Sequence, residues 1–193
     1  MYPESLSRFK YILASKSPRR QFLLSELGIP FELKTKDVDE SFPSHLKAEE
    51  IPLFLCRKKA EAFHDELSND SIIITADTIV WVNGHVLNKP ADEAEARLML
   101  RELSGNRHEV YTGVCLKSSD KEVAFTARTD VFFKELSEGE ISYYIQHFQP
   151  FDKAGSYGAQ EWIGYIAVER IEGSYFNVMG LPVKELYEEL SNF

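Results

Sequence analysis

The stretch that decides how the fold begins is "LASKSPRRQFLLSELG", residues 13–28. A short apolar run from Tyr11 to Ala14 predicts a strand, and Ser17 followed by Pro18 predicts the N-terminus of a helix. Leucines at helical spacing predict a buried stripe on this helix, and Gly28 predicts its end. The stretch therefore predicts a strand, a tight turn and a helix of about three turns.

Two arginines, Arg19 and Arg20, lie in the first turn of this predicted helix. The helix dipole disfavours cations there by about 0.3–1 kcal/mol each. Backbone N–H groups at a helix N-terminus bind phosphate, and Ser15 and Ser17 would add donors to such a site. The arginines therefore indicate a phosphate site, with two solvated arginines as the alternative on this stretch alone.

The composition limits the class of protein. The chain has 193 residues, 44% hydrophobic and 27% charged, which fits one domain over residues 1–193 in two lobes with no separable linker. A net charge of −9 argues against nucleic-acid partners but allows a local basic pocket for a nucleotide-sized anion. Cys56 and Cys115 lack metal-ligand spacing, and no apolar run suits a signal peptide or membrane span. We therefore expect a cytoplasmic protein with reduced core thiols and no membrane partner.

The stretch "SIIITADTIVWVNGHVLNKP", residues 71–90, contains the first candidate for catalysis. Its β-branched run predicts a buried strand that ends at Asp77, and Asn83-Gly84 predicts a hairpin beyond it. Ligand crevices in open α/β sheets form at the carboxyl ends of strands, and a buried Asp needs a cation or metal to stay ionised. Asp77 is therefore predicted to be functional, with a turn-capping role as the alternative, and Lys89 could return to the same region.

A predicted helix over residues 48–67 carries three consecutive cations. Lys59 falls on its apolar stripe, whereas Arg57 and Lys58 are turned further away. Lys59 is therefore positioned to meet a buried anion, with a lysine that snorkels to solvent as the alternative. The segment before this helix is a strand from Phe31 followed by acidic residues that include Glu40.

The rest of the chain predicts alternating helices and strands. We expect a helix from Asp92 to Leu103, strands at residues 108–117 and 121–133, a helix from Ser137 to Phe148, a strand from Ile163 to Ile171 and a helix from Pro182. This order predicts an α/β fold with a mixed sheet. Glycines around Gln160 predict a loop where backbone approaches a ligand, and the Gln160 amide could read a base edge.

Together these stretches resemble the Maf family, the septum-formation-associated nucleotide pyrophosphatases. The resemblance covers nearly the whole chain, in the blocks "LASKSPRRQFLL", "ADTIV", "LNKP", "LSGNRHEVYTGV", "DKAGSYGAQ" and "GSYFNVMGLPV". It implies an inosine-triphosphatase-like (Maf/Ham) α/β fold, with a mixed, twisted sheet flanked by helices and two lobes around a cleft, often as a homodimer. It also implies hydrolysis of a nucleoside triphosphate to the monophosphate and pyrophosphate with a divalent cation, Mg²⁺ or Mn²⁺.

The family pattern implies a role for each matching residue. Asp77 matches the catalytic base, and Glu40 matches an acidic position near the metal that Asp77 would help to hold. Hard oxygen ligands of this kind suit Mg²⁺ or Mn²⁺. The phosphate- and substrate-binding positions match Ser15, Arg19, Arg20, Lys59 and Lys89.

Three positions separate a family branch that acts on dTTP and UTP from one that acts on methylated GTP. They hold Arg19, Thr78 and Gln160 here, which is similar to the dTTP/UTP pattern. The other branch resembles "SPWRR", "ADQ" and an acidic residue in place of Gln160. One departure lies on the base side, where Glu161 and then Trp162 follow Gln160 although the family usually has glycine after the glutamine.

The resemblance therefore implies a dTTP/UTP pyrophosphatase that cleans the nucleotide pool, with a possible link to cell-division arrest. One alternative is a pyrophosphatase for a modified purine nucleotide such as methylated GTP, which the departure at Glu161 leaves open. Another is a non-enzymatic regulator of septation. The absence of a GxxxxGK[ST] loop argues against a P-loop phosphotransferase.

Overall fold

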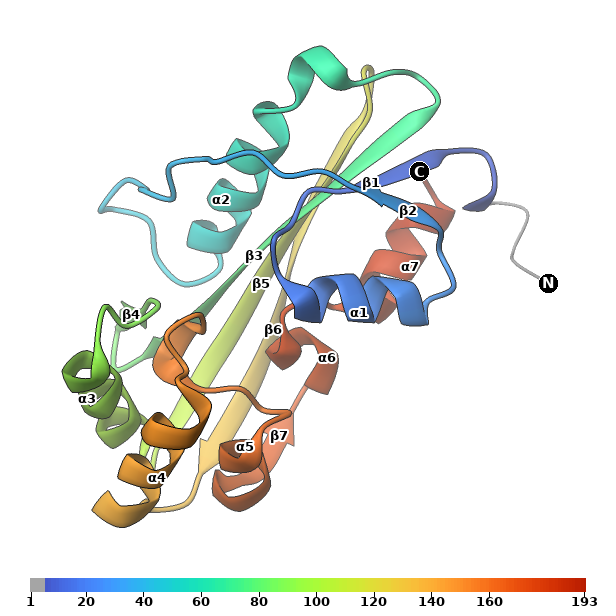
Figure 1. Ribbon diagram of the computed structural model, residues 1–193. Helices are drawn as coiled ribbons and strands as arrows, with labels where there is room; N and C mark the ends of the chain where they lie inside the picture. The colour runs from blue at the N-terminus through green and yellow to red at the C-terminus, as the bar shows by residue number, and fades with distance from the viewer. Residues whose placement is uncertain (1–5) are drawn as a thin grey trace. The chain divides into compact units, whose positions relative to one another are not determined.

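The computed structural model describes residues 6–193 (Figure 1). The strands of this range form one seven-stranded sheet in the order β2-β1-β3-β5-β6-β7, with β4 paired to β3. They are β1 (Lys10–Leu13), β2 (Phe31–Leu33), β3 (Ser71–Val82), β4 (His85–Leu87), β5 (Arg107–Lys117), β6 (Glu122–Phe133) and β7 (Val168–Glu172). β1 is parallel to β2 and β3, whereas β4 is antiparallel to β3 and β7 to β6. The predicted mixed sheet is confirmed.

Helices flank this sheet, so the predicted α/β class is also confirmed. They are α1 (Pro18–Glu26), α2 (Glu50–Glu61), α3 (Glu93–Leu103), α4 (Glu138–Phe148), α5 (Trp162–Ala167), α6 (Tyr175–Met179) and α7 (Val183–Ser191), with short 3₁₀ turns η2 (His64–Glu66) and η3 (Ala154–Ser156). In the part of the chain that the structure describes, no helix combines the length and apolarity needed to cross a membrane.

The chain divides into two compact units. Unit 1 contains the residues up to Asp77, Thr112–Ala127 and Gly180–Phe193, and unit 2 contains Thr78–Tyr111 and Arg128–Met179. Each unit takes its residues from separate parts of the sequence, and the division falls within β3, β5 and β6. The expectation of one domain over residues 1–193 with two lobes around a cleft stays a prediction.

α1 in unit 1 begins where the sequence predicts. The Ser17 hydroxyl accepts a hydrogen bond from the Arg20 N–H at 3.4 Å, and Pro18 occupies the first turn. Gly28 follows the helix with a φ of +69°, a conformation that glycine adopts without strain. The predicted strand, turn and helix are therefore confirmed.

α2 lies directly against the sheet of unit 1. A Cβ added to Gly113 of β5 would lie 2.4 Å from the carbonyl carbon and oxygen of Pro52 in α2, so only glycine fits this contact. The Thr75 hydroxyl of β3 donates to the Cys56 carbonyl of α2 at 2.7 Å. These contacts fix α2 against β3 and β5, one turn before Lys59.

The two cysteines are thiols in the core of unit 1. Cys56 and Cys115 are fully buried and form no disulfide. Burial raises the pKa of the Cys115 thiol to about 12, so this thiol stays protonated at neutral pH. The predicted core thiols are confirmed.

Unit 2 begins with the predicted hairpin and has its own apolar core. Asn83 and Gly84 form the turn with φ of +49° and +85°, and Val80 pairs with Leu87 across it. The predicted capping box of α4 is present between Ser137 and its third helical residue. The core contains buried side chains from β3, β5 and β6 and from α3, α4 and α5.

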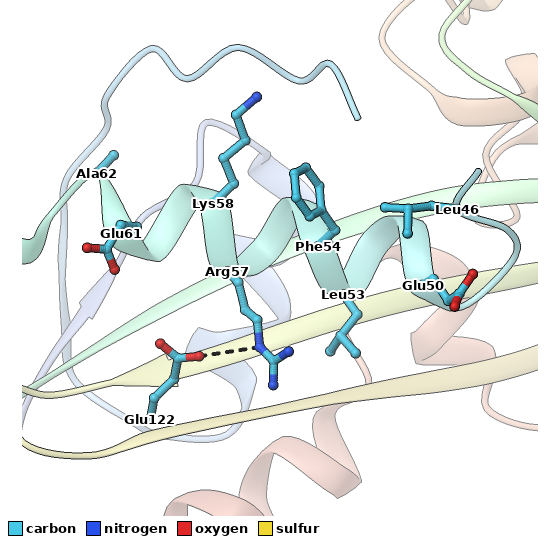
Figure 2. A pocket seen from close by; sticks show the side chains of 9 residues that line it. All are labelled: Leu46, Glu50, Leu53, Phe54, Arg57, Lys58, Glu61, Ala62 and Glu122. Atoms are coloured by element: carbon cyan, nitrogen blue, oxygen red, sulfur yellow. Dashed lines mark ion pairs between the residues drawn. The ribbon is translucent and has the colours of Figure 1, made fainter. Parts of the chain in front are cut away.

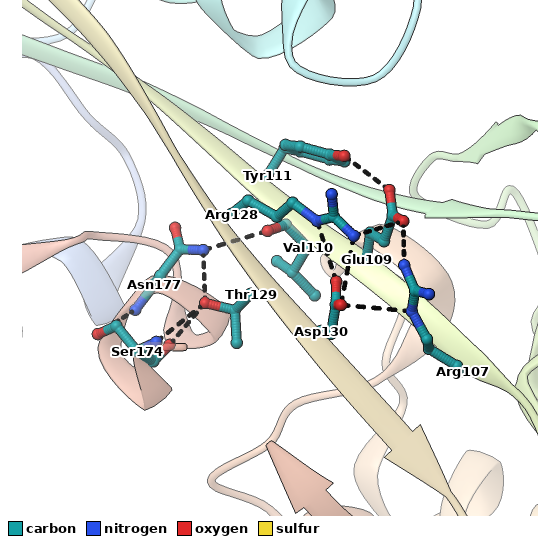
Figure 3. Close-up of polar contacts among 9 residues, drawn as sticks. All are labelled: Arg107, Glu109, Val110, Tyr111, Arg128, Thr129, Asp130, Ser174 and Asn177. Atoms are coloured by element: carbon teal, nitrogen blue, oxygen red, sulfur yellow. Dashed lines mark hydrogen bonds and ion pairs between the residues drawn. The ribbon is translucent and has the colours of Figure 1, made fainter. Parts of the chain in front are cut away.

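A buried amide holds α6, a helix that the sequence reasoning did not predict. Asn177 is fully buried, and its Nδ2 donates to the Val110 carbonyl at 3.1 Å and to the Thr129 hydroxyl at 3.0 Å (Figure 3). The Thr129 hydroxyl in turn donates to the Ser174 carbonyl at 3.1 Å, just before the helix. α6 therefore depends on partners that lie 67 and 48 residues away.

β3 is longer than predicted. The strand expected to end at Asp77 continues to Val82. Its pairing with β1 stops at Ile74, but its last residues pair with β4, so the hairpin keeps the chain extended beyond the parallel neighbour. Asp77 therefore lies within β3 rather than at its carboxyl end, and that part of the prediction is wrong.

The strand predicted from Ile163 to Ile171 is partly wrong. The first part is the helix α5, and only Val168–Glu172 forms β7. Ile163 and Ala167 are four residues apart and both fully buried, which is helical spacing. A Cβ on Gly164 would lie 1.9 Å from the Ala159 carbonyl oxygen, so this glycine allows the tight approach with which α5 begins.

Candidate active site

Lys59 links two carboxylates in unit 1. Its Nζ lies 2.5 Å from Asp77 Oδ1 and 2.8 Å from Glu40 Oε1. The side chains of Lys59 and Asp77 are 16% and 12% exposed, whereas that of Glu40 is 49% exposed. α2 supplies the lysine, β3 supplies the aspartate and the segment after β2 supplies the glutamate. The buried anion that the helical spacing predicts for Lys59 is therefore Asp77.

The two cations that precede Lys59 have other partners. Lys58 Nζ pairs with Asp39 Oδ2 at 3.0 Å, and Arg57 Nε lies 3.3 Å from Glu122 Oε1. Their different directions follow from the 100° rotation between successive helical residues. The prediction that Lys59 differs from its two neighbours is confirmed.

The acidic segment at residues 37–40 is held by lysines and by its own turn. Lys16 pairs with Asp37, and the Ser41 hydroxyl and N–H both donate to Asp39. Hydrogen bonds from Ser41, and then from Lys58, lower the pKa of Asp39 to about 2. The sequence did not indicate a role for Lys16, because its partner Asp37 is 21 residues away along the chain.

Arg19 and Arg20 are partly buried in the first turn of α1. Arg20 Nε donates to the Gly180 carbonyl at 2.8 Å, which ties α1 to the C-terminal segment of unit 1. Burial lowers the pKa of Arg20, while the nearby charges of Asp77 and Glu40 raise it. The charge of Arg19 lowers it further. The arginine pair therefore shares one electrostatic environment with the carboxylates.

Ser15 shapes the turn before α1. It is 7% exposed, and its hydroxyl oxygen accepts from the Ser17 N–H at 3.2 Å. Its carbonyl accepts from Gln21 Nε2 at 3.3 Å. Because a hydroxyl that accepts can still donate, Ser15 keeps the donor that the predicted phosphate site requires.

The carboxylate pair fits a hard divalent cation that is held jointly with phosphate. Among residues 6–193, no group of three or more His, Cys, Asp and Glu side chains could hold a metal ion. Mg²⁺ binds through one or two carboxylates, with waters and substrate phosphates as its other ligands. Asp77 and Glu40, which both contact the same ammonium, provide such a pair.

The remaining predicted site residues belong to unit 2. Thr78 is partly buried in β3, Lys89 is exposed after β4, and Gln160 is partly buried in the loop before α5. The Oε1 atom of Gln160 is buried and has no hydrogen-bond partner among residues 6–193. The structure thus brings Ser15, the arginines and the Lys59 cluster into one unit, whereas their grouping with the unit 2 residues stays a prediction.

Glu161, the residue that departs from the family pattern, is bound by its own chain. Its Oε1 lies 3.0 Å from Lys153 Nζ, and its Oε2 accepts a hydrogen bond from the Tyr144 hydroxyl. Sequence reasoning missed Tyr144 and Lys153. The only signal was a lysine within a glycine-containing loop, and no pattern linked it to Glu161.

Contacts within the chain explain the glycines of this loop. Gly155 has a φ of +66°, and a Cβ there would lie 2.9 Å from Val80 Cγ2. A Cβ on Gly158 would lie 3.1 Å from Gln160 Nε2. These glycines therefore allow the loop to pack against its own unit. The sequence pattern alone could not distinguish this packing role from the predicted close approach of backbone to a ligand.

A pocket along α2 is separate from the Lys59 cluster (Figure 2). It has a volume of about 680 Å³ and is lined by Leu46, Glu50, Leu53, Phe54, Arg57, Lys58, Glu61, Ala62 and Glu122. Neither Lys59 nor Asp77 lines it. The chemical groups that point to catalysis therefore lie elsewhere in unit 1.

Fold and site together define a mixed α/β protein in which Lys59 bridges two carboxylates and two arginines lie in the first turn of α1. The chain belongs to the Maf family, because residues 10–193 match the family model described as Maf-like protein. The resemblance found in the sequence blocks is thus confirmed.

Relatives cover almost the whole chain. The dTTP/UTP pyrophosphatase of Phocaeicola vulgatus is 56% identical over 188 residues, 97% of each chain. That of Bacteroides fragilis is 54% identical and covers 96% of this chain and 97% of its own. That of Parabacteroides distasonis is 51% identical over 98% of this chain and 99% of its own.

Two solved structures are also similar to the chain. The nucleoside-triphosphatase / dITP/XTP pyrophosphatase of Mycobacterium abscessus matches with a TM-score of 0.46 and 19% identity, over 95% of this chain and 97% of its own. The Ham1 protein of Staphylococcus aureus matches with a TM-score of 0.47 and 16% identity, over 93% and 99% of the two chains.

Proposed function

We propose that this protein is a nucleoside triphosphate pyrophosphatase that hydrolyses dTTP and UTP to the monophosphate and pyrophosphate. The observation that carries the proposal is the Lys59 bridge between Asp77 and Glu40, beside the arginine pair of α1. Hydrolysis of a phosphoric anhydride needs cations around the phosphates and a carboxylate that can accept a proton. The names of the relatives, at 51–56% identity, support the choice of substrate.

The cations of unit 1 would bind the triphosphate. Arg19, Arg20 and Lys59 supply charged donors, and the first turn of α1 adds backbone N–H groups. Ser15 would donate its hydroxyl hydrogen, and Lys89 of unit 2 would add another cation. A bound phosphate also offsets the unfavourable interaction of the arginines with the helix dipole.

Asp77 would act as the general base. A water proton moves to its carboxylate while the water oxygen attacks the α-phosphorus. The bond from the α-phosphorus to the bridging oxygen then breaks, and pyrophosphate leaves with the bonding electrons. Lys59 pairs with Asp77 in the free protein, and a phosphate oxygen that binds Lys59 would weaken this ion pair and release the carboxylate.

Asp77 and Glu40 would hold Mg²⁺ or Mn²⁺ together with the phosphates. Such an ion neutralises charge on the phosphate oxygens as a Lewis acid. Lys59 balances part of the repulsion between the two carboxylates and so keeps them together. Their donor type and number suit an ion that takes its other ligands from substrate and water.

Thr78 and Gln160 would read the base. The Gln160 Oε1 atom is a buried acceptor without a donor among the residues that the structure describes, so a ligand that donates there gains a hydrogen bond. Thymine and uracil carry an N3–H donor, whereas N3 of cytosine is an acceptor. This difference favours dTTP and UTP over a cytosine nucleotide, because the wrong base leaves buried polar groups unpaired.

The alternative substrate, methylated GTP, is not favoured. A guanine-type base presents N–H donors that a free carboxylate would accept, and Glu161 is the acidic residue beside Gln160. Both oxygens of Glu161, however, already have partners in unit 2. The role of a non-enzymatic septation regulator has no support in these contacts.

The decisive experiment is pyrophosphate release from a panel of nucleoside triphosphates, with Mg²⁺ and with Mn²⁺, for wild type and Asp77→Asn. We expect release from dTTP and UTP, and a loss of at least about 100-fold in the variant because the amide cannot accept the proton. Release from a modified purine nucleotide only would contradict the specificity. No release from any nucleotide would contradict the enzymatic function.

We also propose a homodimer, as the family resemblance implies, and a location in the cytoplasm, which the two free buried thiols favour. Light scattering after size-exclusion chromatography measures the mass in solution directly. A mass of one chain of 22.2 kDa at micromolar concentration would exclude the dimer.

A further inference from the structure

Three side chains of unit 2 that the proposed chemistry does not use converge beside Gln160. They are Tyr144 of α4, Lys153 at the start of the glycine-containing loop and Glu161 just before α5. Tyr144 is fully buried and Lys153 is 7% exposed. A buried lysine that meets a carboxylate and a buried hydroxyl in one place requires a reason, because each of these groups is costly to bury.

The Tyr144 hydroxyl connects two points of the loop. It accepts a hydrogen bond from the Gly158 N–H at 3.1 Å and donates its own hydrogen to Glu161 Oε2. Burial raises the pKa of Tyr144, and the hydrogen bond to Glu161 raises it further. The hydroxyl therefore keeps its proton, and this donation to Glu161 persists at neutral pH.

Lys153 holds the other oxygen of the same carboxylate. Its Nζ lies 3.0 Å from Glu161 Oε1 and 2.7 Å from Asp152 Oδ1. With Tyr144 on Oε2, both oxygens of Glu161 are held from different directions. A carboxylate held in this way has one orientation, and so does the backbone that carries it.

Gln160 lies between Gly158 and Glu161, the two residues that Tyr144 and Lys153 hold in place. The Glu161 N–H donates to the Gly158 carbonyl at 3.0 Å, which closes the turn around Gln160. A Cβ on Gly158 would lie 3.1 Å from Gln160 Nε2, so the amide packs against the bare α-carbon of this glycine. The opposite end of the amide is Oε1, the buried acceptor for which residues 6–193 provide no donor. Movement of Gly158 or Glu161 would therefore turn this acceptor.

We propose that Tyr144, Lys153 and Glu161 are positioning residues that fix the direction of the Gln160 amide and thereby select bases that carry an N3–H donor. The inference rests on the proposed function, because it concerns the base that the same loop would read. None of the three residues needs to touch the nucleotide. Their effect on selectivity passes through the orientation of Gln160 Oε1.

The test is the variant Tyr144→Phe, which removes one oxygen atom and leaves the packed ring in place. We expect the KM for dTTP and UTP to rise about tenfold with kcat within about twofold of wild type, since base binding and not phosphate chemistry is changed. The preference for dTTP over dCTP should fall by a similar factor. The matched control is Tyr143→Phe, the same change at the preceding residue of α4, where the side chain is 43% exposed, and it should leave both values unchanged.

A second variant, Glu161→Gln, covers the case in which Tyr144→Phe does not fold. It keeps the shape of the side chain but removes the charge that holds Lys153, and we expect the same loss of preference for dTTP over dCTP. Equal loss on all substrates, or an unchanged ranking in a folded variant of either kind, would overturn the positioning role. Wild type is assayed first, so an inactive wild type refutes the proposed function, whereas an active wild type with an unaffected variant refutes only this inference.

Discussion

A single ammonium group compensates two carboxylates at the centre of the candidate site. Asp77 is nearly buried and Glu40 is half exposed, so solvent screens the ion pair of Lys59 with Asp77 less than its ion pair with Glu40. Lys59 also lies in the last turn of α2, where the helix dipole favours a cation. Arg19 and Arg20, in contrast, lie in the first turn of α1, where it does not. The helix dipole therefore favours the charge of Lys59 before any ligand binds, whereas the two arginines would gain more from a bound anion.

Lys59→Met should destabilise the protein and abolish pyrophosphate release. Methionine keeps the apolar stem but leaves Asp77 without its counter-charge, which we expect to cost about 1–3 kcal/mol of unfolding free energy, measured by urea titration. The neighbouring Lys58→Met is the control. It removes a more exposed ion pair with Asp39 and an exposed hydrogen bond to the Ser41 carbonyl, so it should cost less than about 1 kcal/mol and keep activity. Equal effects of the two substitutions would contradict the role assigned to Lys59.

Elements whose signals lie in their own first residues were predictable from the sequence. Ser17-Pro18 at α1 and the capping box of α4 are confirmed as predicted. α5, α6 and the full length of β3 differ from the prediction for separate reasons. Asn177 fixes α6 through strands 67 and 48 residues away, which no local pattern reveals. The contact of Gly164 with Ala159 in α5 is local but leaves no periodic signal, and β3 continues through Asp77 into the predicted hairpin without a break. The candidate site divides in the same way. The position of Lys59 on the apolar stripe of α2 follows from helical periodicity. Its ion pair with Glu40, in contrast, depends on how α2 packs against the sheet.

That packing gives a prediction at the scale of elements, Gly113→Ala. The added methyl group would lie 2.4 Å from backbone atoms of Pro52, so α2 must move away from β5. We expect a loss of about 1–3 kcal/mol in unfolding free energy, as for an overpacked core, together with a fall in activity because α2 carries Lys59.

Gly139→Ala in α4 is the matched control for this substitution. Its nearest contact would be the Ser137 hydroxyl at 3.9 Å, and alanine has the higher helix propensity, so the protein should gain up to about 1 kcal/mol. Chemical denaturation of the two variants measures the contrast. A neutral Gly113→Ala would mean that β5 and α2 can separate without cost.

On the scale of the whole molecule, the pH dependence of stability should depend on a buried histidine of unit 2. His108 is 1% exposed, and its Nε2 lies 2.8 Å from the Tyr157 hydroxyl. The Phe133 ring meets the imidazole edge to face at a centroid distance of 4.9 Å, and Nδ1 of His108 has no hydrogen-bond partner within the described part of the chain. Burial lowers the pKa of His108 to about 3, with a smaller opposing effect of Asp130.

The pKa of His108 in the folded protein is thus below the value of about 6.5 in an unfolded chain. As the pH falls through 6.5, the unfolded state binds a proton that the folded state refuses, so stability is complete above pH 6.5 and declines towards pH 3. Between pH 7 and pH 5 the decline should be about 2 kcal/mol. The lowered pKa values of Asp39 and Glu140, both about 2, act mainly below this interval.

Urea titrations of wild type and His108→Gln at pH 7 and pH 5 measure this effect. The variant should lose the decline whatever its absolute stability, because glutamine has no proton to gain in this range. His147→Gln, at an exposed histidine of α4, should keep the wild-type decline. If His108→Gln declines as wild type does, the imidazole is not held neutral by burial, and water must reach its unpaired nitrogen.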